Sequence, residues 1–441
     1  MPHVPFRSLL TTTALLLVAG AGGAMAADLT ANTGAKNWSG SGMAPAGAAE
    51  TQDLRGQGVR ERARPGYDAI GLRAGSFVVL PSLEVAETYD DNIFATENNK
   101  DSDFITSVRP RVDVISTWSR HSLNLTAGLQ RSYFADHSSE NKTDYDFGMD
   151  GRLDILRDTN VTGALSHAQK HEDRGSATFS STTAAEPVEY KQTDASIAFN
   201  QRFNRVTTTL GAAYTRLNYE DVASTAGPIL DEDLRDRDVY TQKLRAGYDV
   251  SPDTNVFVQG SLNQRRYDIG MPIQDRDSKG YEAVVGSRFK LSTLASGEVY
   301  VGYQRQNYDA AGLSDVTGLS YGANVNWYVT PLSTVRFNAA STIEESDLGG
   351  TSGYLRQVVG VGIDHELLRN VILRGDLSYE NDDYKGATRK DDYYGGGVGV
   401  SYLLNRFVAM GLDYDYTKRD SNAAGADYSR NRVMFTIRGQ L

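Results

Sequence analysis

Hydrophobic and polar residues alternate with a period of two along most of this chain, from about Gly75 to the last residue. One face of the segment 319–329 carries Leu319, Tyr321, Ala323, Val325, Trp327 and Val329, and the other carries Ser320, Gly322, Asn324, Asn326 and Tyr328. Successive side chains of a β-strand point to opposite faces, so this pattern predicts strands with one apolar and one polar face.

Charged residues follow the same alternation in other segments. Around residue 375, Val371, Leu373, Leu377 and Tyr379 alternate with Arg374, Asp376, Ser378 and Glu380. A charge on the lipid face of a transmembrane barrel costs about 2 to 4 kcal/mol at the bilayer midplane, so we expect the charged face to line a lumen.

Short polar turns alternate with longer loops along the chain. Short connections fall at residues 119–120, 158–160, 204–205, 251–253, 293–295, 330–331, 369–370 and 405–406, and long ones lie between them. Outer-membrane barrels have short periplasmic turns and long external loops. The sequence therefore predicts an all-β fold of the outer-membrane type: a transmembrane antiparallel up-and-down β-barrel of about eighteen strands, spanning residues 75–441.

The N-terminus predicts export. Arg7 precedes the apolar run Leu9–Val18, which is followed by small residues and the sequence Ala24-Met25-Ala26. These are the parts of a secretory signal peptide, and the run is too short for a membrane anchor, which needs roughly 20 residues. We expect residues 1–26 to be removed and the protein to reach the cell outer membrane.

Residues 27–74 are rich in Gly, Ala, Ser and Asn and carry Arg55, Arg60, Arg62 and Arg64. Such a composition buries little apolar surface, which predicts a flexible periplasmic segment. The alternative is a plug whose arginines dock on acidic residues of the lumen.

Composition excludes several kinds of chemistry. The chain has no cysteine, six histidines and a net charge of -11, which disfavours thiolate sites, most His-based catalysis and nucleic-acid binding. His167 and His171 lie too far apart on a strand to share one ion. The glycines at 395–399 and 360–362 imitate a phosphate loop, but no helix follows them. We therefore predict no enzyme activity, no cofactor, no metal site and no nucleic-acid partner.

Polar residues on the inward faces are the candidate pore lining: Arg109, Arg111, Asp113, Arg216, Arg265, Tyr267, Tyr300, Arg374, Asp376, Glu380, Asp413, Asp415 and Arg432. Arginines facing carboxylates across the lumen would create a transverse field that tunes the passage of polar solutes. Tyr267 and Tyr300 could stack on sugar rings, or could simply pack against neighbouring wall residues.

Two further sets of residues point to the membrane. Tyrosines at strand ends predict aromatic girdles at the two interfaces: Tyr89, Tyr133, Tyr219, Tyr308, Tyr379, Tyr402 and Tyr416. Arg-Asp sequences recur at the outer ends of strands, at 235–238, 276–277, 389–391 and 419–420. These arginines could bind lipopolysaccharide phosphates, or could form solvated salt bridges with their neighbours.

Several short sequences carry a resemblance to a known family. They are Tyr89-Asp90-Asp91-Asn92-Ile93-Phe94, Arg109-Pro110, Trp118-Ser119-Arg120-His121, Arg276-Asp277-Ser278-Lys279-Gly280-Tyr281 and Trp327-Tyr328-Val329-Thr330-Pro331. The chain from about Ser76 to Leu441 resembles the beta-barrel porins that are often found with bacterial exopolysaccharide gene clusters. The resemblance implies an outer-membrane barrel, with a pore connected to surface polysaccharide, and implies no catalytic residues.

We therefore expect a porin-like aqueous channel for polar solutes, linked to exopolysaccharide export. A non-conducting barrel that serves as an envelope or secretion-complex subunit is the alternative. The expected partners are outer-membrane lipid and lipopolysaccharide, the barrel-assembly machinery, and polysaccharide or polysaccharide-export proteins.

Overall fold

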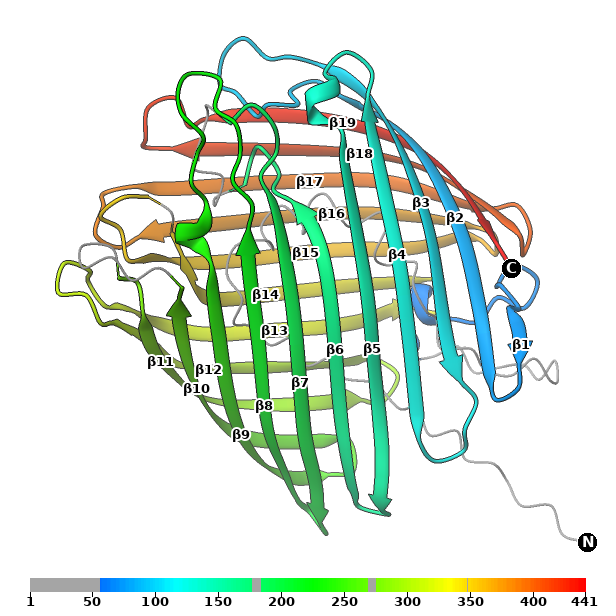
Figure 1. The fold of residues 1–441 in the computed structure, drawn as a ribbon. Helices are drawn as coiled ribbons and strands as arrows, with labels where there is room; N and C mark the ends of the chain where they lie inside the picture. The colour runs from blue at the N-terminus through cyan, green and yellow to red at the C-terminus, as the bar shows by residue number, and fades with distance from the viewer. Residues whose placement is uncertain (1–55, 177–183, 269–274, 347) are drawn as a thin grey trace, which may run out of the picture.

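A closed barrel of eighteen long antiparallel strands, β2 to β19, forms the body of the protein (Figure 1). The computed structural model describes residues 56–176, 184–268, 275–346 and 348–441. The expected signal peptide, residues 1–26, and the first part of the expected flexible segment, residues 27–55, lie outside the described residues. Long loops gather at one end of the barrel, and the C-terminus lies at the end with the short turns (Figure 1).

The strands of the first half of the chain are β1 (Leu72–Ala74), β2 (Phe77–Asp90), β3 (Asp103–Ser116), β4 (Ser122–Phe134), β5 (Lys142–Leu156), β6 (Thr159–His171), β7 (Glu189–Phe203), β8 (Val206–Tyr219), β9 (Arg237–Ser251) and β10 (Thr254–Tyr267). Those of the second half are β11 (Ser278–Leu291), β12 (Ala295–Tyr308), β13 (Val316–Thr330), β14 (Ser333–Glu345), β15 (Gly353–Leu368), β16 (Val371–Tyr384), β17 (Lys390–Leu403), β18 (Val408–Ser421) and β19 (Tyr428–Gln440). The 3₁₀ turns are η2 (Val59–Glu61), η3 (Ser138–Glu140) and η4 (Asp233–Arg235). None of the helical turns in the described part of the chain has the length and apolar character of a membrane-spanning helix.

The last strand closes the barrel against the first long one. β19 pairs with β2 from Arg432 opposite Asp90 to Gln440 opposite Ser82. Every other neighbouring pair from β2 to β19 is antiparallel and consecutive in the chain, as the alternating turns predicted. The predicted fold class and strand number are confirmed.

Lipid exposure follows the predicted alternation. Leu319 is 55% exposed, whereas Ser320, the next residue, is fully buried. Leu373 and Val433 are exposed as well, while the side chain of Arg374 is 7% exposed. A band of apolar side chains therefore covers the outside, and polar side chains face the lumen.

The tyrosines divide between two positions. Tyr89, Tyr133, Tyr379 and Tyr402 are exposed on the lipid side, as expected of an aromatic girdle. Tyr219 and Tyr308 are not girdle residues, because they are only 3% and 8% exposed and belong to clusters of buried side chains.

Residues 56–74 differ from the flexible segment that we expected. They contain the turn η2 and the short strand β1, which pairs with the start of β2. Val59 is completely buried, and its backbone amide donates a hydrogen bond to the Thr334 hydroxyl at 3.0 Å. Ordering this segment is possible because its arginines meet carboxylates of the barrel wall, as described below.

Candidate pore lining and mouths

The wall from β2 to β5 carries the first group of predicted lining residues. Arg109 pairs with Glu84 on β2 at 2.7 Å. Arg111 pairs with Asp113 at 2.9 Å and lies 3.6 Å from Asp146 on β5. These charges face the lumen, and their partners lie on the same strand or on a strand nearby in the wall.

A second group lies on β16, β17 and β18. The Arg374 guanidinium is 2.9 Å from the Asp413 carboxylate. Gly399 of β17 lies between these two residues in the strand register. A Cβ atom at position 399 would collide with the Asp413 carboxylate, so a glycine is needed for the ion pair to cross β17.

Gly397 has the same role one pair further along. A Cβ atom there would lie 2.7 Å from Asp415 Oδ1 and 3.0 Å from Asp376 Oδ2. The glycine run that imitates a phosphate loop therefore provides space above β17 for charged side chains of its two neighbours.

Glu380, another predicted lining residue of this wall, is also engaged locally. Arg356 of β15 donates two hydrogen bonds to Glu380, at 2.8 and 2.7 Å. Arg432 also faces the lumen and lies opposite Asp415 in the register of β18 and β19, but its Nη2 atom is buried without a hydrogen-bond partner among the described residues.

The expected transverse field is not what these positions produce. Positive and negative side chains alternate along one wall and pair with close neighbours, so their fields largely cancel over a few ångströms. The sequence identified inward-facing charges but could not show which of them become neighbours.

Three lining candidates face inward but pack into the wall. The buried Arg265 guanidinium pairs with Glu345, and the Tyr267 hydroxyl donates to the same carboxylate at 2.7 Å. Tyr300 lies opposite Gly322, and a Cβ atom at 322 would collide with the Tyr300 ring. The tyrosine therefore packs over the glycine, which agrees with the alternative of wall packing for this residue.

Arg216 was assigned to the wrong face. Leu210 on the same face of β8 is exposed to lipid, and Arg216 forms ion pairs with Asp268 and with Asp238 on the outer surface. The inward face of β8 carries Leu217, which is buried against loop residues. Because leucines occur on both faces, the sequence does not show which face meets the membrane.

The arginines of the outer Arg-Asp sequences are occupied within the protein. Arg235 pairs with Glu172 and Glu232, while Arg389 pairs with Asp391 at 2.6 Å. The contacts of these residues agree with internal salt bridges. Lipopolysaccharide as a partner stays a prediction.

Three consecutive residues after β6 hold a loop across the outer mouth. Glu172 pairs with Arg235 before β9, Asp173 with Arg430 on β19, and Arg174 with the 3%-exposed carboxylate of Glu140 before β5. The loop thereby connects parts of the rim that are far apart in the chain. The charged run was visible in the sequence, but its three partners were not.

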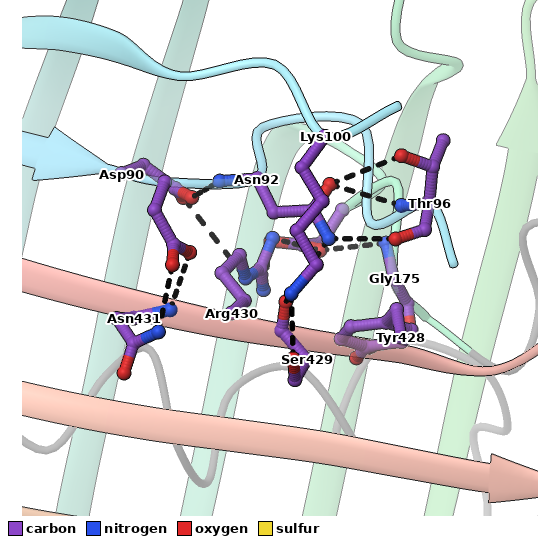
Figure 2. Close-up of polar contacts among 11 residues, drawn as sticks. Asp90, Asn92, Thr96, Lys100, Gly175, Tyr428, Ser429, Arg430 and Asn431 are labelled. Carbon is purple, nitrogen blue, oxygen red and sulfur yellow. Dashed lines mark hydrogen bonds and ion pairs between the residues drawn. The ribbon is translucent and has the colours of Figure 1, made fainter. Parts of the chain in front are cut away.

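Figure 2 shows where this loop meets the last strand. The Arg430 guanidinium donates to the Asp173 carboxylate at 3.1 and 3.2 Å and lies 3.9 Å from Asp90. The Tyr428 hydroxyl donates to the carbonyl of Gly175 at 3.2 Å.

The pKa of Asp173 reflects this setting. Burial alone would raise the pKa of this carboxyl, but the guanidiniums of Arg430 and Arg432 outweigh it and hold the pKa well below its usual range. The carboxylate is therefore ionised at any physiological pH.

The Tyr89–Phe94 motif forms a clasp between the first and last barrel strands. The fully buried Asn92 donates from its amide nitrogen to the carbonyls of Thr96 and Ser429, at 2.8 and 3.0 Å. Asn431 donates from its backbone and its side chain to Asp91, both at 2.7 Å. The motif is therefore structural.

A histidine at the outer mouth is sensitive to its carboxylate neighbours. His137, between β4 and β5, lies 2.9 Å from Asp103 and 3.3 Å from Asp101. The hydrogen bond with Asp103 outweighs the effect of burial and raises the pKa of His137 above its usual 6.5.

The periplasmic mouth is occupied by residues 56–64, part of the N-terminal segment between residue 27 and β1 that is called the leader below. Arg60 pairs with Asp364 at 2.8 Å, and Arg64 with Glu366 at 3.1 Å. Both carboxylates are on β15, facing the lumen, next to the short turn that leads to β16. Burial lowers the pKa of Arg60, and the Asp364 carboxylate partly offsets this effect. Residues 56–64 thus follow the plug alternative at this end of the lumen.

Together, the lipid-facing apolar band, the polar lumen and the sorted loops define a transmembrane barrel of the outer-membrane class. The sequence model of the family described as "Putative beta-barrel porin 2" matches residues 64–441, and the chain belongs to this family. No curated protein sequence matches the chain.

Solved structures with a similar course of the chain include other barrels. OpdL of Pseudomonas aeruginosa is 11% identical, with a TM-score of 0.42 over 83% of this chain and 99% of that one. The outer membrane protein OpdK of the same organism is 11% identical, with a TM-score of 0.43 over 82% and 99%. The siderophore receptor PirA of Pseudomonas aeruginosa is 7% identical, with a TM-score of 0.42 over 82% and 80%.

Proposed function

We propose that this porin-like outer-membrane barrel is an aqueous channel for polar solutes, sugars among them. The observation that carries the proposal is the wall from β3 to β5. There the inward-facing side chains of Arg111 and Asp146 remain 32% and 49% exposed, although they belong to the inner face of a closed barrel. Charged groups that solvent reaches inside a barrel indicate a water-filled space along this wall.

Pairing of opposite charges on this wall supports passage of neutral polar solutes with weak ion selectivity. Conductance of the full-length protein in planar bilayers tests the proposal, and the reversal potential in a salt gradient should be close to zero. Replacing Asp113 and Asp146 with asparagine leaves Arg111 without a carboxylate partner and should shift selectivity toward anions. The matched control is Asp238→Asn, on the outer surface, which should leave the reversal potential unchanged. A folded protein that shows no conductance even after residues 27–71 are removed would refute the channel.

The second candidate is a non-conducting barrel that serves as an envelope subunit, and the leader within the periplasmic mouth favours it. A variant without residues 27–71 separates the two candidates. If the leader only restricts the lumen, current rises when it is removed. If the protein is a structural subunit, neither the full-length protein nor the shortened variant conducts current.

The proposal includes export with a signal peptide removed after Ala26, which the mass of the mature N-terminal peptide tests. It also includes membrane insertion by the barrel-assembly machinery, contact with lipopolysaccharide, and a connection with exopolysaccharide export through a polysaccharide or an export protein. It assigns no catalytic step. Block of the current by purified oligosaccharides tests the polysaccharide connection, and equal currents with and without them would argue against it.

A further inference from the structure

Strands β13 and β14 pair along only part of their length. Their register begins with Thr330 opposite Ser333 and, after a shift, runs from Trp327 opposite Val335 to Gly322 opposite Ala340. Beyond this point, residues 316–321 of β13 pair with β12, and residues 341–345 of β14 pair with β15. Among the described residues, these two outer segments share no ladder pair, so the backbone ladder of the wall is interrupted between them.

The outer end of β14 and the start of β15 lie against the inner face of the wall. A Cβ atom at Gly318 of β13 would be 2.8 Å from Leu355 of β15. In a regular sheet, strands two apart are separated by about 9.6 Å, twice the usual strand spacing. Because Leu319 faces lipid, Gly318 faces the lumen, and Leu355 must have moved inward to reach it.

Buried side chains seal this overlap. Ile343 packs with Tyr308 and Val316, and Leu355 packs against the same cluster. Tyr308 and Val316 belong to the part of β12 and β13 that forms the wall. Ile343 and Leu355 belong to the ends of β14 and β15 that lie inside it. The ends of β14 and β15 therefore form a second layer of sheet on the inner face of β12 and β13.

Side chains of the lumen replace the missing ladder bonds. The Ser341 carbonyl accepts from Gln304 Nε2 at 3.1 Å, and the Ile343 carbonyl accepts from Arg265 Nη2 at 2.8 Å. Arg265 also pairs with Glu345, which accepts a hydrogen bond from the Tyr267 hydroxyl. The carbonyls of Ser341 and Ile343, which accept hydrogen bonds from side chains in this structure, can accept hydrogen bonds from backbone amides of β13 in a second conformation.

We propose that residues 341–345 and 353–357 form a flap that gates the outer half of the lumen. In the inward state shown by the structure, the flap narrows the lumen. In the second state it moves outward, and β14 completes its ladder with β13, continuing the existing register so that Ser320 faces Thr342. The contacts of Glu345 with Arg265 and Tyr267 hold the inward state. The effect on conduction rests on the proposed channel function, whereas the movement does not.

Cysteine pairs distinguish the two states, because the chain contains no cysteine. In full-length protein in liposomes, the pair Gly318→Cys and Leu355→Cys should form a disulfide in the inward state. The pair Ser320→Cys and Thr342→Cys can form one only when the ladder is complete. The matched control is Asn324→Cys with Asn338→Cys, which face each other in the part already paired and should crosslink in either state.

We expect all three pairs to crosslink, the ladder pair most slowly. Glu345→Gln should accelerate the ladder pair by roughly tenfold or more, because one tenfold change needs only about 1.4 kcal/mol and a buried ion pair contributes more. A ladder pair that never forms, in either background, while the control pair forms, would overturn the flap.

Conductance then tests gating. The inward disulfide should lower the current and the ladder disulfide should raise it, each reversed by a reductant. Equal currents in the two locked forms would overturn gating. No current in any variant, also after residues 27–71 are removed, would instead refute the proposed channel, and crosslinking would still decide whether the flap moves.

Discussion

The ion pair between Asp173 and Arg430 should decide whether the loop after β6 stays across the outer mouth. Asp173→Asn keeps the shape of the side chain and removes its charge. Arg430 is 5% exposed and would keep Asp90, at 3.9 Å, as its carboxylate partner among the described residues. Removing one partner of a buried ion pair costs about 3 to 5 kcal/mol. We take the lower end because Asp90 remains and because the Asp173 side chain is 22% exposed. About 3 kcal/mol raises the equilibrium constant for loop release by roughly a hundredfold.

Hydrogen exchange of a peptide that covers residues 171–176 measures this effect in detergent or in liposomes. Glu220→Gln is the matched control, because the exposed pair of Glu220 with Lys191 should contribute less than about 1 kcal/mol. The lowered pKa of Asp173 adds a second test. Its stabilisation is present above the usual pKa of 3.8 and is lost as the pH falls through the lower pKa of the folded state, so acid should release the loop in the wild type. Unchanged exchange in Asp173→Asn at neutral pH would refute the reasoning.

Three further outcomes are expected. Gly399→Val should separate Arg374 from Asp413 and lower the midpoint of heat-induced unfolding on gels, and an unchanged midpoint would contradict the role of this glycine. Arg64→Gln should leave Glu366 without its 3.1 Å partner and make the leader more sensitive to protease at the periplasmic mouth, with the barrel itself unaffected as the internal control. The raised pKa of His137 means that its contacts stabilise the outer loop below about pH 6.5 and weaken as the pH rises through the raised value. The protection of the loop amides, measured relative to their intrinsic exchange rate at each pH, should therefore fall on going to alkaline pH in the wild type and not in His137→Gln.

The fold could be predicted from the sequence because the lipid bilayer constrains which residues can face outward. A strand such as β13 must place Leu319 outward and Ser320 inward, because a polar residue in hydrocarbon is costly, and this constraint repeats in every strand. Where the constraint is weak, the prediction fails. β8 carries leucines on both faces, and Arg216 was therefore assigned to the lumen although it lies outside.

The contacts of the site could not be read from the sequence in the same way. Alternation fixes the face of Arg374 but not its partner, because pairing across β17 depends on the absence of a side chain at Gly399. The order of residues 56–64 depends on carboxylates about 300 positions away, such as the one that Arg60 meets on β15. Composition therefore predicted a flexible segment, since local sequence contains no information about such distant partners.

The clasp formed by the Tyr89–Phe94 motif has a consequence for assembly. It joins β2 to β19, the two strands that are furthest apart in the chain, and closing so long a loop carries the largest entropic penalty of any strand pairing in the barrel. Bonds from Asn92 and Asn431 across this seam favour the closed ring once the two strands meet. Loss of the Asn92 side chain should therefore slow the step in which newly inserted chains close the ring. It should have less effect on what the finished barrel transports.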